Sequence, residues 1–496
     1  MTLTRTITVG AGVFAPGHLG ELTWQVPFEL ADCVLADALA AGRRLRDLPS
    51  RTGLYFVLAL GLFPQLGYLN VWRKLTAALE GAPGVPSPSA KALRDLRRRV
   101  GAAPLRALFE VLAGPAAQPS TPGVRFGRYR TVSFDGCNSV KVPDTARNRA
   151  WLGKQGNARG ETGYPAIELM TLAETGTRSL LGAVFGPRTG ETGYAAQLVH
   201  LLRPDMLVLT DRGFDSGGFL EAVAATGAQF LARLTSCRAL PALTCLSDGT
   251  YLSRIGTLTV RVIDAQVTVT LADGTRFTAR YRLATTLTDH HRYPAPALLR
   301  LYHERWEHEI AYLALRHTLL DGRVLRSRDP AGLQQEIWAL LALYQAIRRE
   351  MTLAAETIPG TDPDRASFTI ALHAATGTLA SPDVLPGSQP AGRIGQAVLA
   401  ALLPPRRPRV SIRKVKSPLS RYAKSDDGRP ATSQNITSLD IAVCAQAGPP
   451  ELPSGGSATP SGNNMQSPPG SAPRSRQRQP RREKKTAKIL TNAAGP

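Results

Sequence analysis

The spacing of the hydrophobic residues changes near residue 128, and this change sets the domain organisation. Before residue 115 the apolar residues recur at helical intervals, and no strand pattern interrupts them. We therefore expect residues 1–115 to form a helical domain, a candidate for DNA binding. Its longest apolar run, 54–63, is too short to span a bilayer and favours a buried helix. The expected helices are 27–40, 51–62, 67–80 and one that begins near 88.

From residue 128 onward the residues alternate as they do in strands. Closely spaced strands come first, and strands separated by helices follow; this order predicts a mixed α/β core over residues 125–350. Residues 236–287 are β-rich, with a hairpin turn at Asp273-Gly274, and are expected to be an insertion in that core. The expected core strands are 128–134, 139–142, 167–174, 179–186, 206–210 and 229–234, with helices at about 194–203 and 217–226.

The C-terminal part is helical at first and then polar and basic. After the core we expect a helical and basic segment at 351–425 and a disordered, low-complexity basic tail at 426–496. The long helices expected near the end of the core are 296–320 and about 330–351. The pentapeptide GETGY occurs at 160–164 and again at 190–194, with no repeat unit around either copy.

The chain is strongly basic, with a formal net charge of +22. A polyanionic partner is the simplest reason for such an excess, because Lys and Arg gain most by displacing counterions from phosphates. Residues 404–424 contribute +8 and residues 447–496 contribute +6, which leaves +8 for the rest. Charge alone therefore supports nucleic-acid binding without proving it. The five cysteines are scattered and form no CxxC pair, which argues for a reducing compartment and against a structural zinc site.

Two aspartates follow apolar strand patterns. Asp135 follows RYRTVSF and Asp211 follows MLVLT. In α/β sheets functional groups gather beyond the carboxyl ends of strands, so both positions suit a site. Either aspartate alone would more often belong to a turn or a helix cap. The pair at two strand ends is the stronger observation.

Four side chains of the helix expected at 296–320 share one narrow stripe. At about 100° per residue, Arg305, Glu309 and Arg316 fall close to the direction of Tyr302. The stripe holds a carboxylate between two guanidiniums and is expected to be flanked by buried apolar side chains, namely Trp306, Ile310 and Leu313. The alternative is an ordinary ion pair within the helix, since Arg305 and Glu309 are four residues apart.

Three acids from separate elements suit metal-assisted chemistry at a phosphodiester. Such chemistry can use two hard cations about 4 Å apart, and Mg²⁺ takes carboxylate, water and phosphate oxygens. Neighbouring arginines can hold phosphate in bidentate fashion. A zinc motif is excluded because His303 and His308 point about 140° apart on a helix. Nothing else favours the sugar chemistry that Glu304 and Glu307 might suggest.

These residues resemble the motifs of transposases in the insertion-sequence 4 family. The string at Tyr302, Arg305, Glu309 and Arg316 is similar to the family's Y-R-E-K signature, with Arg316 in place of Lys. The segments FDG with VPDT (134–145) and LTDRGFDS (209–216) resemble its two aspartate motifs. Further likeness lies in 44–75 and 335–348, and the resemblance covers about residues 5–425.

The resemblance implies an RNase H-like core and a DDE transposase. Asp135, Asp211 and Glu309 would bind two Mg²⁺ ions, with Mn²⁺ as a substitute, and Tyr302, Arg305 and Arg316 would contact DNA. The expected partners are double-stranded DNA, both transposon ends and target, and a second copy of the chain in a paired-end complex, in the bacterial cytoplasm at the nucleoid. Two alternatives stay open: a nuclease that cuts without strand transfer, and an inactive transposase-derived DNA-binding protein.

Overall fold

The computed structural model describes most of the chain up to residue 404. The ranges are 18–38, 48–77, 85, 87–154, 156–157, 160–161, 163–379, 391–404, 409–410 and 434–445. Most of the basic segment 404–424, and the tail apart from 434–445, lie outside the described residues. The described residues all belong to one compact unit.

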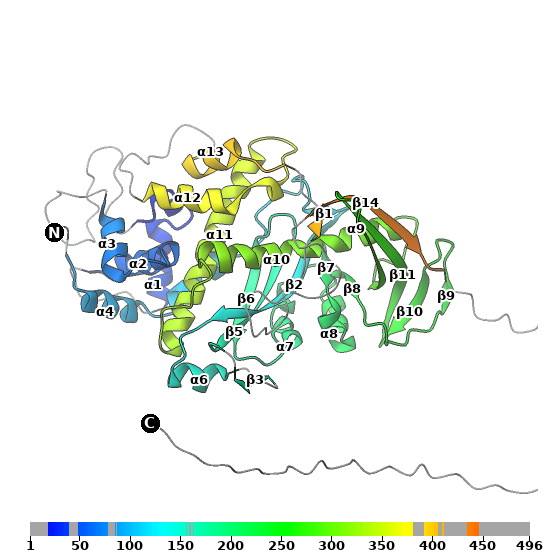
Figure 1. Cartoon of the computed structure of the whole chain (residues 1–496), viewed down its shortest axis with the longest axis horizontal. Helices are drawn as coiled ribbons and strands as arrows, with labels where there is room; N and C mark the ends of the chain where they lie inside the picture. The colour runs from blue at the N-terminus through cyan, green and yellow to red at the C-terminus, as the bar shows by residue number, and fades with distance from the viewer. Residues whose placement is uncertain are drawn as a thin grey trace, which may run out of the picture. The chain divides into compact units, whose positions relative to one another are not determined.

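Short helices make up the described N-terminal region, as its apolar spacing predicts. They are α1 (Phe28–Asp37), α2 (Ser50–Leu62), α3 (Tyr68–Thr76), α4 (Ala90–Val100) and α5 (Ala103–Leu112). The apolar run predicted to be a buried helix is α2, in which nearly every residue is buried. Figure 1 shows these helices in blue, beside the long α11 (Pro330–Glu356). They share one hydrophobic core with α11 and with α12 (Phe368–Thr378) and α13 (Arg393–Ala400).

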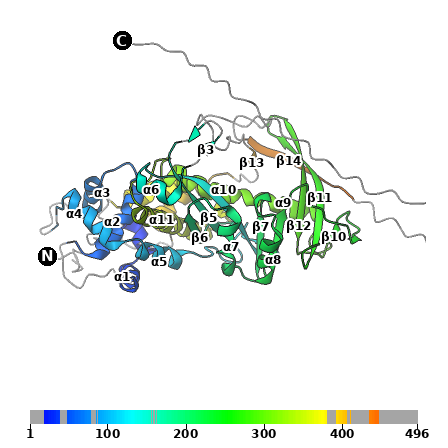
Figure 2. The same cartoon turned by 90° about the horizontal axis from the view of Figure 1, so that it is seen from below.

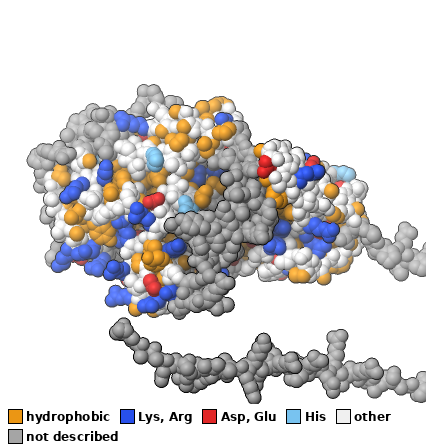
Figure 3. Space-filling model, in the orientation of Figure 1, with side chains coloured by type: hydrophobic (Ala, Val, Ile, Leu, Met, Phe, Trp, Pro, Cys, Tyr) orange, Lys and Arg blue, Asp and Glu red, His pale blue; other side chains and the backbone are white. Residues whose placement is uncertain are grey.

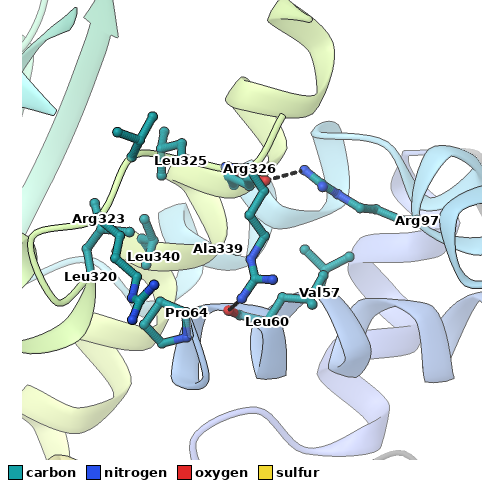
Figure 4. A pocket seen from close by; sticks show the side chains of 13 residues that line it. Val57, Leu60, Pro64, Arg97, Leu320, Arg323, Leu325, Arg326, Ala339 and Leu340 are labelled. Atoms are coloured by element: carbon teal, nitrogen blue, oxygen red, sulfur yellow. Dashed lines mark hydrogen bonds and ion pairs between the residues drawn. The ribbon is translucent and has the colours of Figure 1, made fainter. Parts of the chain in front are cut away.

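Two arginines fasten the N-terminal helices to the rest of the unit. Arg326 donates to the carbonyls of Phe63 (2.7 Å) and Leu66 (2.5 Å), just past the end of α2, where a helix leaves carbonyls without intrahelical partners. Arg97 of α4 pairs with Glu336 of α11, with 3.0 Å between Nη2 and Oε1. Figure 4 shows both arginines lining a small hollow between α2 and α11.

A mixed sheet forms the centre of the core. Its strands run in the order β6-β5-β2-β7-β8, where β5 is antiparallel to β2 and β6, and β7 is parallel to β2 and β8. This mixed sheet and its flanking helices confirm the expected α/β, RNase H-like class. The bounds are β2 (Tyr129–Lys141), β5 (Ala166–Glu174), β6 (Leu180–Gly186), β7 (Met206–Thr210) and β8 (Gln229–Arg233), with the short β1 (Arg125–Phe126) beside β2, and β3 (Gly156–Asn157) pairing with β4 (Gly160–Glu161).

Helices cover both faces of this sheet, because strand side chains alternate between faces. Val132 and Phe134 of β2 pack in one cluster with Tyr194 of α7 (Glu191–Ala196) and Phe219 of α8 (Gly217–Ala225). Ser133, between them in sequence, faces α10 (Trp306–Leu313) on the other side. Figure 2 shows α7 and α8 on the side of the sheet away from α10. The short α6 (Ala146–Leu152) follows β2.

The β-rich segment extends the sheet beyond β8. It comprises β9 (Thr244–Cys245), β10 (Tyr251–Ile255), β11 (Leu258–Leu271) and β12 (Arg276–Thr285), and Gly274 in the predicted hairpin turn has φ +81°. The structure corrects the expected tail, because β14 (Gln434–Val443) lies within it and pairs with β11, and β13 (Arg409–Val410) pairs with β14. Main-chain pairing along the edge of β11 orders a polar stretch that composition alone marks as disordered. Within the described ranges, every helix is too short or too polar to cross a membrane.

Candidate active site

The register between two parallel strands brings Asp135 and Asp211 side by side. β2 pairs with β7 up to Ser133, which lies opposite Leu209. Continued for two residues, this register places Asp135 level with Asp211, and neighbouring strands lie about 4.8 Å apart. Residues two apart along a strand point to the same face, so Asp135 projects to the face that Ser133 shares with α10, and Asp211 follows the end of the neighbouring strand β7.

Asp135 does not close its strand, in contrast to the prediction. β2 continues through Asp135 to Lys141 and merges the two strands expected on either side of Gly136. The reason is that β2 has two neighbours. Its parallel pairing with β7 ends at Ser133, whereas its antiparallel pairing with β5 continues and places Thr171 opposite Asp135. Asp211 does follow the last residue of β7, as predicted.

The segment expected as one helix at 296–320 consists of four consecutive pieces. They are α9 (Ala295–Tyr302), a 3-10 turn (His303–Arg305), α10, and a π turn (Ala314–Leu319). Tyr302, Arg305, Glu309 and Arg316 each lie in a different piece. A constant 100° per residue therefore does not hold along the segment, and Leu313, expected on a buried flank, is 55% exposed. Irregular turns of this kind often mark functional sites.

Hydrogen bonds to the sheet fix α10 in place. The two ring nitrogens of His308 lie 2.8 Å from Ser133 Oγ and 2.6 Å from Thr171 Oγ1, and the Tyr312 hydroxyl donates to the Asp135 carbonyl at 2.6 Å. Burial lowers the pKa of His308 to about 3, so its ring is neutral. Neither His308 nor Tyr312 was predicted to support the site. Their four-residue spacing, which puts both on one helix face, was the only signal in the sequence.

Arg305 links two of the three acids. Its Nη1 lies 4.0 Å from Asp135 Oδ2, and its Nη2 lies 3.4 Å from Glu309 Oε1. The ion pair within the helix, which the sequence left as an alternative, is therefore present. The guanidinium also reaches the sheet, however, and only 7% of its side chain is exposed. This contact joins Glu309 to Asp135 across two elements.

The pKa of Asp135 depends on burial and on the charges around its carboxyl group. Burial raises the pKa of its carboxyl to about 7, Arg305 opposes that rise, and the nearby charges of Glu309 and Asp211 add to it. The charges of Glu309 and Asp211 therefore act on Asp135. Burial also raises the pKa of Tyr302 to about 12, so its hydroxyl keeps its proton at neutral pH.

The two outer signature residues lie at the margins of this group. Tyr302 is 5% exposed and makes an edge-to-face contact with Tyr281 of β12, at 6.1 Å between ring centroids. Arg316 lies in the π turn, where its Nη2 is 3.4 Å from His317 Nε2, and it lines a small hollow with Cys137. The structure therefore brings Arg305 to the acids and leaves Arg316 beside the next part of β2.

The three acids offer the type of ligand that a hard divalent cation prefers. Carboxylate oxygens from three elements are the ligands that Mg²⁺ and Mn²⁺ prefer. Across the described residues, no three His, Cys, Asp or Glu side chains are close enough as they stand to hold an ion. Arg305 supplies the positive charge between Asp135 and Glu309, and a divalent cation would compete with it for both carboxylates.

Comparison with known proteins shows which families and relatives this chain resembles. Residues 16–110 match the family described as insertion element 4 transposase N-terminal, and residues 129–345 match the transposase DDE domain. Transposase InsG for insertion sequence element IS4, of Escherichia coli (strain K12), is 27% identical over 424 residues, which cover 82% of this chain and 93% of InsG. Putative transposase InsZ of the same organism is 26% identical over 190 residues, 38% of this chain and 61% of InsZ.

Among solved structures, a piggyBac transposase synaptic complex with hairpin DNA aligns with 78% of this chain and 85% of that one, at 9% identity and a TM-score of 0.38. The two family matches follow one another in the order of the N-terminal helices and the mixed-sheet core, and the relative InsG is matched over nearly its whole length. The chain belongs to the insertion-sequence 4 family of DDE transposases.

Proposed function

We propose that this transposase cuts DNA at the inverted-repeat ends of its element and joins the freed 3′ ends to target DNA. Asp135, Asp211 and Glu309 form its metal-binding triad. The observation that carries this assignment is the parallel pairing of β2 with β7, whose register continued by two residues sets Asp135 level with Asp211, together with the Arg305 contacts that join Glu309 to Asp135.

Asp135, Asp211 and Glu309 would hold two Mg²⁺ ions, or Mn²⁺ in their place. When bound, divalent ions supply an activated water and stabilise the leaving oxygen of the phosphodiester. The Arg305 guanidinium lies between Asp135 and Glu309, where it would hold a phosphate oxygen of the DNA in a bidentate pair. Tyr302 stays protonated and donates its hydroxyl to a neighbouring phosphate.

DNA contacts extend beyond the triad. Figure 3 shows Lys and Arg side chains over the N-terminal helices and over the β-rich segment. Exposed examples are Arg98 of α4 and Arg276 of β12, whose side chains are 78% and 67% exposed. We assign DNA binding to the helical region 1–115, the basic segment 404–424 and Arg316. A dimer brings the two ends together, and the protein acts at the bacterial nucleoid.

Replacing Glu309 by Gln tests the triad. The change removes one charge while keeping the shape of the side chain, so cleavage of an end-containing duplex should fall by at least a thousandfold, while binding of that duplex without metal stays near the wild-type level. The control is Asp321→Asn, because Asp321 is 64% exposed, pairs with its near neighbour Arg323, and lies outside the segments assigned to DNA binding. Unchanged cleavage by the Glu309 variant would remove this residue from the triad.

A strand-transfer assay with paired ends separates the alternatives. A transposase yields joined products, a nuclease yields cut ends alone, and an inactive DNA-binding protein yields neither product while still shifting the duplex on a gel.

A further inference from the structure

Glu191, in the second GETGY copy at 190–194, lies next to the proposed triad. Its Glu191 begins α7 and lies against the glycines that follow both aspartates. A methyl group at Gly136 would lie 2.9 Å from Glu191 Oε1, and one at Gly213 would lie 3.2 Å from Glu191 Oε2 and 3.0 Å from Asp211 Oδ1. The Glu191 carboxylate therefore occupies the space between the two backbone segments that carry Asp135 and Asp211, and the missing side chains of these glycines leave room for it.

Glu191 reaches this space from the face of the sheet opposite Glu309. α7 packs with Phe134 on one face, whereas Glu309 comes from α10 on the other. Two bonds hold the start of α7 in position: Thr192 Oγ1 donates to the carbonyl of Gly213 at 3.3 Å, and the Tyr194 hydroxyl donates to the carbonyl of Pro187 at 2.7 Å. These bonds fix the backbone of α7, and the position of that backbone places the Glu191 side chain next to Gly136 and Gly213.

The Glu191 carboxylate brings a further negative charge close to Asp211, since Glu191 Oε2 and Asp211 Oδ1 lie 3.2 Å and 3.0 Å from the point that a methyl group at Gly213 would occupy. Glu191 raises the number of carboxylates around the Asp135 and Asp211 segments to four, and Arg305 pairs with two of the others, Asp135 and Glu309. Negative charge close to a cation site strengthens binding even from residues that do not touch the ion, and loss of an outer partner typically costs 10–100-fold in metal affinity.

We propose that Glu191 is a positioning residue of the metal site: it holds the Asp135 and Asp211 segments at their spacing and strengthens their grip on a divalent cation through its charge. This inference rests on the proposed triad. Neither the triad motifs nor the signature helix pointed to Glu191, which in the sequence is simply part of a repeated pentapeptide.

The test is a titration of the full-length, DNA-free protein with Mn²⁺, followed by electron paramagnetic resonance of the unbound ion. Glu191→Gln keeps the size and polarity of the side chain and removes only its charge. We expect it to weaken Mn²⁺ binding about tenfold and to shift the Mg²⁺ dependence of cleavage to higher concentration by a similar factor. A role limited to filling space would survive this substitution with its metal affinity intact.

The controls separate this inference from the proposed function. Asp321→Asn should bind Mn²⁺ like the wild type, and Glu309→Gln should bind it more weakly. If Glu309→Gln weakens binding and folded Glu191→Gln does not, the role of Glu191 is overturned and the triad stands. If neither weakens it, the triad itself is wrong. Where Glu191→Gln is recovered only unfolded, Glu191→Ala takes its place, and wild-type affinity again overturns the inference.

Discussion

Asp135→Asn should stabilise the metal-free protein while abolishing its activity. Asp135 lies beside two other acids with 15% of its side chain exposed, and burial raises its pKa to about 7, so the ionised form is disfavoured in the fold. Asn has nearly the same shape, carries no charge, and can still accept the Gly136 amide hydrogen bond that Asp135 Oδ1 accepts at 3.0 Å.

The size of the effect follows from the pKa difference. An aspartate in an unfolded chain has a pKa of about 3.9, and each unit of pKa corresponds to about 1.4 kcal/mol. At pH 8, above both values, ionised Asp135 therefore costs the fold up to roughly 4 kcal/mol. Asn also loses the attraction of Arg305, and rearrangement of side chains around ionised Asp135 lowers its cost in the wild type. We therefore expect Asp135→Asn to raise the free energy of unfolding by about 1–3 kcal/mol.

The sign of the pH dependence is what tests the reasoning. Because the folded pKa is raised, the cost is full above pH 7 and disappears as the pH falls toward 4, where Asp135 is protonated in both states. Urea unfolding of both proteins in EDTA at pH 8 and pH 5 measures the difference. Asp95→Asn, at a carboxylate that is 53% exposed, is the control and should change little. A variant that is less stable at pH 8, or equally stabilised at both pH values, would refute a buried charge at this position.

Three further predictions concern the hydrogen bond that holds α10 to the sheet, the attachment of the N-terminal helices, and the pH dependence of metal binding. Tyr312→Phe removes the hydroxyl that holds the Asp135 carbonyl at 2.6 Å; we expect a loss of about 1–3 kcal/mol in unfolding free energy and slower cleavage with unchanged end binding, and full activity would contradict a positioning role. Arg326→Ala removes the side-chain donor from the carbonyls of Phe63 and Leu66 past α2; thermal melting should show a loss of about 2–3 kcal/mol in unfolding free energy, only partly restored by Lys because Lys lacks the fork of donors. Mn²⁺ affinity should fall about tenfold per pH unit below pH 7, because the proton on Asp135 competes with the cation; a flat profile between pH 5 and 7 would show that Asp135 is not a ligand.

Much of the fold could be read from hydrophobic spacing. The helix of 54–63, the β-rich segment with its Asp273-Gly274 turn and the alternation around β7 and β8 are local patterns, and each was found at or near its predicted place. The predictions were wrong where pairing with a neighbouring strand decides whether a segment forms a strand. β2 continues past Asp135 because β5 pairs with it there, and residues 434–443 form a strand because the edge of β11 accepts them.

The sequence alone determined the chemistry that this protein can carry: three acids in the order and setting of a known signature, an arginine four residues before the last of them, and a basic surface suited to DNA. Tertiary structure decided how these groups meet. The β2–β7 register sets Asp135 level with Asp211, the His308 and Tyr312 bonds hold α10 against the sheet, and Glu191 arrives from the opposite face. Those contacts join residues far apart in the chain, and no local spacing encodes them, because they depend on which strands pair and which helices pack on either side.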